Sequence, residues 1–324
     1  MARNRFLAAL DEGLVSIADG ARVALLRVPG DWPLDGLERA HIGISHGFFP
    51  EAARWQARGF DVTRNAQPAD VALVAAPRSR ALARALAAEA AAAAPVVIVD
   101  GQRTDGVDAL WRDARARLGA APTLTMGHGR LFVLHPEDRL ADWASAGPVR
   151  GADGFFTQPG VFSEGRADPG SRLLAGALPA TLPARMGDLG AGWGYLAQAV
   201  LARAGVESLD LVEAEALALD CARHNITDDR AAFHWADALA FTPARAWGGI
   251  VMNPPFHHGR AGDPGLGHAF IAAARRGLAP NGQLWMVSNR HLPYEETLAA
   301  AFRKVIRLRE EAGFVVHHAT GPRR

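Results

Sequence analysis

The sequence contains almost no cysteine and almost no lysine. Cys221 is the only cysteine and Lys304 the only lysine among 324 residues. A single cysteine excludes an intramolecular disulfide and any zinc site that needs several cysteines. Arginine supplies all the other basic residues, and alanine is abundant. We attribute this arginine excess to genome-wide base composition rather than to selection for RNA contact.

Long hydrophobic runs are also missing. The longest, Ala90–Val99, is interrupted by Pro95 and is about half of the ~20 residues that a membrane-spanning helix needs. The first ten residues lack the apolar core and small-residue cleavage site of a secretory signal. Basic and acidic residues number 18 and 17 up to residue 150 and 17 and 17 after it, so neither half is a charged tail. We therefore expect a soluble, cytoplasmic protein without a membrane partner, of a length typical of two domains.

The second half alternates between strand-like and helix-like segments. This order predicts an α/β fold with a mostly parallel sheet and helices on both faces, closed by an antiparallel C-terminal hairpin. The predicted strands are 186–188, 209–213, 232–235, 249–252 and 283–288, the helices are 195–204, 216–224, 268–277 and 294–302, and the hairpin joins 305–310 to 314–318.

The first half repeats this order less completely. We predict strands at 22–28, 71–75 and 96–100, helices at 80–93 and 107–118, and a closing hairpin of 123–126 with 130–135. Aligning residues 96–100 with 284–288 matches a strand, a helix and a hairpin in both halves, which indicates an internal duplication. Pro136–Ala152 is predicted to be a linker. The predicted domains are residues 1–140 and 153–324.

The clearest chemical motif is a glycine-rich turn between a strand and a helix of the second half. Asp188 is followed by Gly190, Ala191, Gly192 and Gly194. Glycines permit a tight turn and let a ligand approach the backbone near a helix N-terminus. The carboxylate of Asp188 would repel the pyrophosphate of a dinucleotide and attract a cationic ligand. The motif therefore favours S-adenosylmethionine over NAD.

Two further acids follow at similar spacing. Glu213 ends the next predicted strand, where a carboxylate can accept hydrogen bonds from both ribose hydroxyls. Glu215 competes for this role, and a solvated carboxylate is the alternative for Glu213. Asp237 follows the third strand and is predicted to accept from an adenine amino group, with Ala238 as a backbone donor. A helix N-cap is an equal alternative for Asp237.

The motif Asn253-Pro254-Pro255-Phe256 ends the fourth strand of the second half. The two prolines donate no backbone hydrogen bonds and stiffen the turn. Their carbonyls and the Asn253 amide can then accept hydrogen bonds from a planar exocyclic amino group, while Phe256 stacks on the ring. The pattern predicts that these four residues hold a base whose amino nitrogen reacts.

Together these motifs resemble class I S-adenosylmethionine-dependent methyltransferases that act on an amino nitrogen. The segments Phe156–Ser163 and Asp168–Leu174 narrow the resemblance to the methyltransferase small domain family. Within it, the chain resembles the ribosomal RNA guanine-N2 methyltransferases of the small-subunit type C and large-subunit type G groups. Those proteins join a degenerate N-terminal domain to a catalytic C-terminal domain, so the resemblance implies two tandem Rossmann-like domains.

The resemblance also implies site roles. S-adenosylmethionine would be bound by Phe162 in the closing segment Phe156–Ser163, by the loop Asp188–Gly194, and by Glu213, Asp237, Ala238 and Asn253. The expected reaction is methyl transfer to the exocyclic N2 of a guanine in ribosomal RNA, with 16S RNA favoured. The expected partner is ribosomal RNA or a partly assembled subunit, and the expected state is a monomer. The bulk of Trp193 and the low net charge depart from the pattern.

Several alternatives stay open at this point. The Asn-Pro-Pro motif also serves methylation of adenine or cytosine in DNA and of glutamine in protein, although those enzymes commonly carry tyrosine at the fourth position. A non-catalytic RNA-binding or assembly protein with a vestigial fold is a further possibility. The sequence leaves open whether Arg260, Arg275, Arg276 and Arg290 cluster near the pocket. No metal site is predicted at His257-His258, and His317-His318 are expected to be an edge pair.

Overall fold

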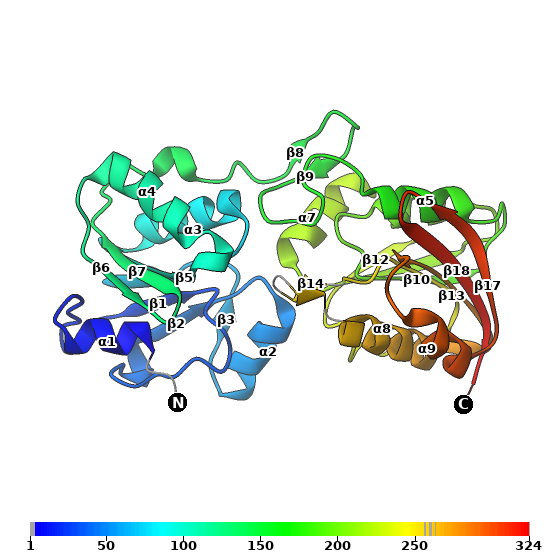
Figure 1. Cartoon of the computed structure of the whole chain (residues 1–324), viewed down its shortest axis with the longest axis horizontal. Coiled ribbons are helices and arrows are strands. Elements are labelled where there is room, and N and C mark those ends of the chain that lie inside the picture. The colour runs from blue at the N-terminus through cyan, green and yellow to red at the C-terminus, as the bar shows by residue number, and fades with distance from the viewer. Residues whose placement is uncertain (1–3, 256, 259–260, 263, 324) are drawn as a thin grey trace. The chain divides into compact units, whose positions relative to one another are not determined.

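The computed structural model describes residues 4–255, 257–258, 261–262 and 264–323. The chain divides into two compact units, Met1–Gly147 and Pro148–Arg324. Each unit contains a 7-stranded, mostly parallel sheet flanked by helices (Figure 1). The predicted α/β class and the two tandem domains are confirmed.

The first unit has the strand order β3-β2-β1-β4-β5-β7-β6. Its strands are β1 Val23–Leu26, β2 Ile42–Ser45, β3 Val62–Thr63, β4 Val71–Ala75, β5 Val96–Gln102, β6 Thr123–Met126 and β7 Gly129–Leu134. Its α-helices are α1 Arg5–Asp11, α2 Phe49–Ala57, α3 Arg80–Ala93 and α4 Val107–Leu118. We did not predict α1, β2, α2 or β3, because these elements are short and their apolar periodicity is weak.

The second unit has the order β12-β11-β10-β13-β16-β18-β17. Its sheet contains β10 Arg185–Leu189, β11 Ser208–Glu213, β12 Ala231–Trp235, β13 Trp247–Met252, β16 Leu278–Asn289, β17 Phe302–Glu311 and β18 Phe314–Pro322. Its helices are α5 Pro169–Ala177, α6 Tyr195–Leu201, α7 Ala216–Asn225, α8 Pro264–Gly277 and α9 Tyr294–Ala301. The short pairs β8 Val149–Arg150 with β9 Phe156–Thr157, and β14 His257–His258 with β15 Ala261–Gly262, lie outside this sheet.

The two sheets share one topology, which supports the predicted duplication. Leu26 pairs with Ser45 and Val74 in the first unit, as Leu189 pairs with Val212 and Met252 in the second. The alignment made from the sequence was one residue out of step. Val74 pairs with Val99 and Met252 pairs with Met286, so residues 96–100 correspond to 283–287. A run of similar apolar residues does not define how the two halves align, because several offsets match equally well. The pairing of each strand with its neighbours defines the alignment.

The core of the second unit lies on both faces of its sheet. Alternate residues of one strand enter different clusters: Met186 and Val251 pack on one face, Ile250 and Met252 on the other. The inner strands β10 and β13 are almost wholly buried, as expected of a parallel sheet covered by helices. Burial on both faces fixes the strand register, which determines where each strand places its last residue.

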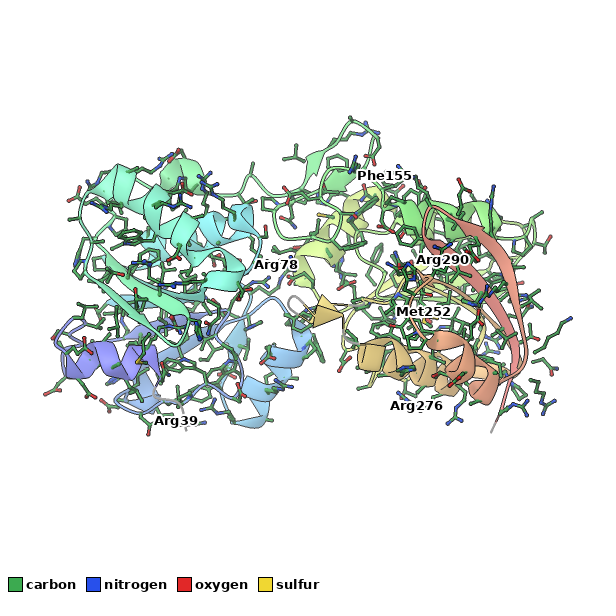
Figure 2. The ribbon with its side chains drawn as sticks, in the orientation of Figure 1. Arg39, Arg78, Phe155, Met252, Arg276 and Arg290 are labelled. Carbon is green, nitrogen blue, oxygen red and sulfur yellow. The ribbon has the colours of Figure 1, made fainter. Side chains whose placement is uncertain are left out.

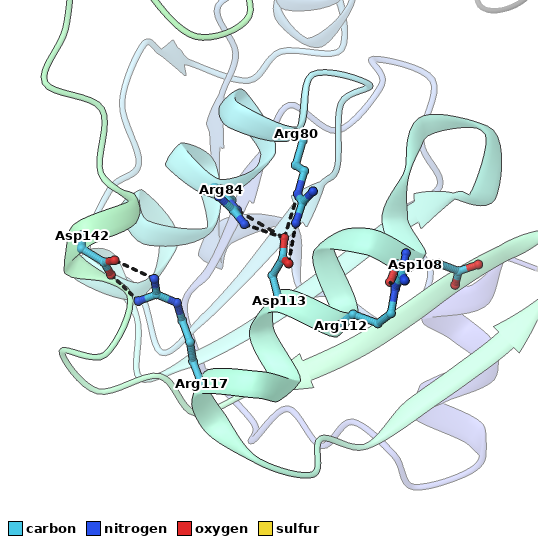
Figure 3. Close-up of polar contacts among 7 residues, drawn as sticks. All are labelled: Arg80, Arg84, Asp108, Arg112, Asp113, Arg117 and Asp142. Atoms are coloured by element: carbon cyan, nitrogen blue, oxygen red, sulfur yellow. Dashed lines mark hydrogen bonds and ion pairs between the residues drawn. The ribbon is translucent and has the colours of Figure 1, made fainter.

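The segment after β7 packs on the first unit. Leu140 and Trp143 are 0% and 7% exposed, and Asp142 accepts hydrogen bonds of 2.5 and 2.7 Å from Arg117 of α4 (Figure 3). The first part of the predicted linker therefore belongs to this unit, which ends at Gly147. Within the residues that the structure describes, no helix is both long and apolar enough to cross a bilayer.

Candidate functional site

The candidate residues gather along the carboxyl edge of the second sheet. Asp188 lies in β10, Glu213 ends β11, Asp237 follows β12 and Asn253 follows β13. These strands are neighbours in the sheet, so successive ends lie about 5 Å apart. The chain continues from β10 to β11 on one side and returns to β13 on the other. The site therefore lies at a topological switch point, where open α/β sheets bind ligands.

The glycine loop joins β10 to α6. Gly190, Gly192 and Gly194 have φ of +71°, +57° and +91°, a left-handed conformation that favours glycine. A Cβ on Gly194 would lie 3.2 Å from Ile226, so this glycine lets α6 and α7 pack closely. A Cβ on Gly192 would meet no described atom within 4 Å. Gly192 thus leaves open space beside the loop.

Asp188 is a buried acid that accepts no hydrogen bond of normal geometry from the described residues, although the nearby Ala197 N–H slightly opposes the rise of its pKa. It is 0% exposed, and neither carboxylate oxygen accepts a hydrogen bond there. Burial, followed by repulsion from Glu213, raises the pKa of Asp188 to about 8. Buried carboxylates are normally paired, and groups with shifted pKa values cluster at functional sites. This orphaned acid fits a ligand that brings a positive charge to the loop.

Glu213 ties the glycine loop to the end of β11. One carboxylate oxygen accepts from Gly192 N at 2.8 Å, and the other accepts from Glu215 N at 2.7 Å. Each oxygen keeps a further lone pair, so the carboxylate can still accept from a ligand diol. Burial raises the pKa of Glu213, while these backbone N–H groups oppose the rise. Glu215, the competitor, is instead the N-cap of α7 through Leu217 N.

Asp237 has a local structural role. One of its carboxylate oxygens accepts from Leu239 N at 2.8 Å, and its carbonyl accepts from Ala240 and Phe241. No helix begins at Asp237, so the helix N-cap alternative is wrong, and these bonds instead close a turn between β12 and β13. Ala238 is 6% exposed. Both residues lie at the carboxyl edge as predicted.

Asn253 has its amide orientation fixed by two acceptors. Its Nδ2 donates to Asp168 Oδ2 at 3.0 Å and to Ser171 Oγ at 2.9 Å. A carboxylate only accepts hydrogen bonds, so the amide nitrogen must face Asp168 and Oδ1 must face away. The side chain therefore offers an oriented acceptor at the end of β13.

The rest of the motif continues from this strand. Pro254 is buried and Pro255 is exposed. Among the described residues, no backbone N–H donates to the Pro254 carbonyl. Phe256 lies outside the described residues. His257 and His258 form β14, and the described residues contain no group of three metal-ligating side chains.

The segment predicted to close over the cofactor is fastened to the glycine loop. Trp193 Nε1 donates to the Phe162 carbonyl at 2.9 Å, and Asn225 Nδ2 donates to the carbonyls of Phe156 and Trp193. The indole is buried beside Cys221. Trp193 thus binds the backbone of this segment through its indole N–H, while the Phe162 side chain remains 58% exposed.

Sequence reasoning missed the positioning roles of Asp168, Ser171 and Asn225. Asp168 and Ser171 begin α5, and Asp168 Oδ2 also accepts from Ser171 N at 2.9 Å as the helix N-cap. The sequence DPGS signals such a cap. Nothing in it shows that the cap lies against a residue 85 positions later. Asn225 directly follows the helix predicted at 216–224, a position that indicates no role for its side chain.

The first unit has the same backbone conformation at the corresponding position but lacks the acidic and amide side chains of this site. Arg27 N donates to Ser45 O at 2.9 Å, as Gly190 N donates to Val212 O at 2.9 Å. Arg27 also keeps a left-handed φ of +55°. Counting from this match places Leu25 at the position of Asp188, His46 at that of Glu213 and Ala75 at that of Asn253.

In the first unit, α2 also occupies the space beside the corresponding loop. Trp55 Nε1 donates to the Val28 carbonyl at 2.8 Å, and Glu51 accepts from Gly30 N at 2.6 Å. A Cβ on Gly30 would lie 2.3 Å from the Arg54 Cβ. Gly192 borders open space, whereas this loop is packed.

The basic residues considered as a cluster near the pocket do not form one cluster within the described part of the chain. Arg275 and Arg276 end α8 at the amino edge of the sheet, whereas Arg290 follows β16 at the opposite edge and pairs with Glu310 (Figure 2). The 14 residues of α8 extend about 21 Å from one edge of the sheet to the other. This length separates Arg275 and Arg276 from the edge at which Arg290 lies. Arg260 lies outside the described residues.

The histidine pair near the C-terminus is not at an edge. His317 and His318 lie in β18, which is flanked by β16 and β17. His317 is 2% exposed and its Nε2 bonds to Glu295, while His318 stacks on Trp285 with ring centroids 4.8 Å apart. The terminal hairpin folds its first strand to the outside, so β17 is the edge.

Comparison with known proteins agrees with this geometry. Residues 153–318 match the family model of the methyltransferase small domain. The ribosomal RNA small subunit methyltransferase C of Shewanella sp. (strain MR-4) is 32% identical over 247 residues, which cover 72% of each chain. The corresponding protein of Shewanella oneidensis is 33% identical over 217 residues, covering 64% of this chain and 63% of that one.

A solved structure extends the likeness to the whole chain. The T. thermophilus 16S rRNA N2 methyltransferase, in complex with AdoMet and guanosine, is 26% identical with a TM-score of 0.79. The alignment covers 99% of this chain and 92% of that one. The chain therefore belongs to the methyltransferase small domain family.

Proposed function

We propose that this protein transfers a methyl group from S-adenosylmethionine to the exocyclic N2 of a guanine in small-subunit ribosomal RNA. One observation carries the proposal. Asn253 presents a fixed acceptor at the end of β13, on the strand next to the glycine loop and the orphaned Asp188. The guanosine and AdoMet in the T. thermophilus structure are the ligands that such an arrangement suits.

The cofactor site is formed by the second unit. Asp188 supplies negative charge for the cationic end of S-adenosylmethionine, Gly192 leaves room at the loop, and Glu213 faces the ribose hydroxyls. Gly190, Ala191 and Gly194 complete the loop, with Asp237 and Ala238 at the adenine end. The first unit carries Leu25, Arg27, His46 and Ala75 at the corresponding positions and binds no cofactor. Bound S-adenosylmethionine supplies an electrophilic methyl group.

The chain's own contribution to the reaction is orientation. The guanine amino group has two hydrogens, and Asn253 Oδ1 and the Pro254 carbonyl accept them. These bonds direct the nitrogen lone pair toward the methyl donor and need no strong base, because a positioned reactant removes much of the entropic barrier. The nitrogen would gain the methyl group as the bond from that group to the sulfonium sulfur breaks, and one of the two amino protons would then leave to water. Asn253 and Phe162 also border the cofactor, Pro255 stiffens the turn, and Phe256 stacks on the base.

The substrate must offer an unstacked guanine, since the amino group is unreachable within a stack. We therefore place the reaction on ribosomal RNA or a partly assembled small subunit, in the cytoplasm, with the enzyme acting as a monomer. The degenerate domain, predicted as residues 1–140, extends to Gly147, and the catalytic domain, predicted as residues 153–324, lies within the second unit.

The proposal is tested with Asn253→Ala. Within the described residues the Asn253 side chain donates to Asp168 and Ser171, and Asn253 is one of many residues that border the cofactor. The substitution should therefore leave cofactor affinity within about threefold and abolish methyl transfer to 16S RNA. Cofactor affinity is measured by calorimetry and transfer by labelled methyl incorporation. Unchanged turnover would contradict the role of Asn253.

A further inference from the structure

Basic side chains without acidic partners gather at the amino edge of the second sheet. Four segments meet there: the starts of β13, β16 and β17 and the end of β18. Over residues 242–248, 272–283, 299–305 and 319–323 the sequence has no aspartate or glutamate. The same segments hold six exposed basic residues, which we call the basic edge: Arg245, Arg275, Arg276, Arg303, Lys304 and Arg323.

Strand pairing brings these residues together. Trp247 pairs with Leu278, which places Arg245 beside Arg275 and Arg276. Phe302 pairs with Pro322, which places Arg303 beside Arg323. The basic edge therefore follows the sheet continuously from β13 to β17.

A cleft lies at the centre of the basic edge. It has a volume of about 270 Å³ and is lined by Arg275, Arg276, Leu278, Pro280, Pro322 and Arg323. Arg276 donates to the Leu239 carbonyl and Arg323 donates to the Phe302 carbonyl. These bonds fix two guanidinium groups at the cleft and leave their charges uncompensated.

The basic edge differs from the rest of the arginine-rich surface. Elsewhere arginines commonly pair with carboxylates: Asp113 accepts from Arg80 and Arg84, and Asp142 from Arg117 (Figure 3). No basic-edge residue lies within 4.0 Å of a carboxylate of the described chain. With a net charge of only +1 for the chain, such a concentration of unpaired positive charge favours the binding of an anionic partner.

We propose that the basic edge binds the phosphate backbone of the RNA substrate. The five residue steps between Trp247 and Met252 separate the basic edge from the Asn253 end of β13 by about 17 Å. A ligand held at both edges must be a polymer, and arginine forks match phosphate oxygens. This inference rests on the proposed function and specifies how the substrate is held: bases enter at the carboxyl edge and phosphates bind at the amino edge.

The test compares two triple variants with equal loss of charge. The first combines Arg245→Gln, Arg275→Gln and Arg303→Gln, whose side chains make no hydrogen bond or ion pair within the described chain. The control combines Arg22→Gln, Arg139→Gln and Arg309→Gln, whose carboxylate partners are 3.9, 4.0 and 3.7 Å away. Thermal unfolding confirms that both variants fold.

Affinity for a 16S RNA transcript is titrated over a range of salt concentrations. Each lost phosphate contact should lower the slope of log affinity against log salt by about 0.7 to 0.9, so the first variant should lose about 2 to 3 in slope and at least tenfold in affinity near 0.1 M salt. The control should keep the wild-type slope. The first variant should also show a raised KM for RNA with unchanged kcat and cofactor affinity.

The outcomes separate this inference from the proposed function. Equal slopes and affinities for the two triple variants would overturn the role of the basic edge, even if the wild type methylates the RNA. A wild type that binds the RNA without methylating it would contradict the proposed function, and the two slopes would still decide whether the basic edge binds phosphate.

Discussion

Replacement of Asp168 by serine should separate the capping role of this residue from its effect on the reaction. Serine is a good N-cap, so α5 should keep its first-turn hydrogen bond and the protein its stability. The shorter side chain cannot reach Asn253 Nδ2, which Asp168 Oδ2 contacts at 3.0 Å. Asn253 would then keep only Ser171 as an acceptor. Because a hydroxyl can donate as well as accept, the amide could turn over.

The expected fall in kcat of Asp168→Ser follows from the strength of the hydrogen bond that is lost. A hydrogen bond to a charged acceptor contributes about 1.5 to 3 kcal/mol. If the loss of this bond raises the free energy of the transition state by about 2 kcal/mol, because Asn253 is no longer held in one orientation, kcat falls about 30-fold. Cofactor affinity should change less than twofold, because neither Asp168 nor Ser171 belongs to the glycine loop. Single-turnover methyl transfer and calorimetric cofactor binding measure the two quantities separately.

A control in the first unit isolates the effect of a lost cap. Ser79 caps α3 by accepting from Leu82 N at 3.3 Å. Ser79→Ala should lower the free energy of unfolding by about 1 kcal/mol and leave kcat unchanged. Asp168→Asn keeps both the cap and an acceptor oxygen, so it should restore part of the lost kcat. Wild-type kcat in Asp168→Ser would refute the conclusion that Asp168 orients Asn253.

Three further predictions concern the glycine loop and its neighbours. The carboxyl of Asp188 has a pKa of about 8 in the folded protein, against an ordinary value of 3.8, so wild-type stability should fall as pH rises between these two values. Asp188→Asn should therefore melt above the wild type at pH 8 yet bind cofactor more weakly, and a lower melting temperature would contradict this. Gly192→Ala should lower cofactor affinity. The control Gly106→Ala, at a glycine with φ of +84° and equally open space, should cost only about 1 to 2 kcal/mol of stability and leave cofactor affinity unchanged. Similar cofactor affinities for the two variants would refute the assignment of Gly192 to the cofactor site. Trp193→Phe removes the bond to the Phe162 carbonyl and should weaken cofactor binding about fivefold by titration, since such a bond contributes about 1 kcal/mol.

Much of the second unit could be predicted because its segments carry consistent signals. The helix Tyr195–Leu201 follows a glycine turn, β11 alternates apolar and polar residues, and β13 is a short apolar run. Glycines at left-handed positions and acids at strand ends depend on local backbone and spacing, both of which the sequence displays. The edge of the sheet where they meet follows from parallel strand order.

Other features depend on pairing between distant segments. The contact of Asp168 with Asn253 joins residues 85 positions apart, and the basic edge collects arginines from four separate segments. The position of α8 decides that Arg276 and Arg290 lie at opposite edges (Figure 2). The register between the duplicated strands became clear only from their hydrogen-bonded partners.

The most direct test of the central claim is methyl transfer from labelled S-adenosylmethionine to unmethylated ribosomal RNA. Small-subunit and large-subunit RNA are assayed in parallel, free and as particles, and the modified nucleoside is identified by mass spectrometry. We predict labelled N2-methylguanosine in the small-subunit substrate. Cofactor binding without incorporation into any RNA, or label on another nucleoside, would contradict the account.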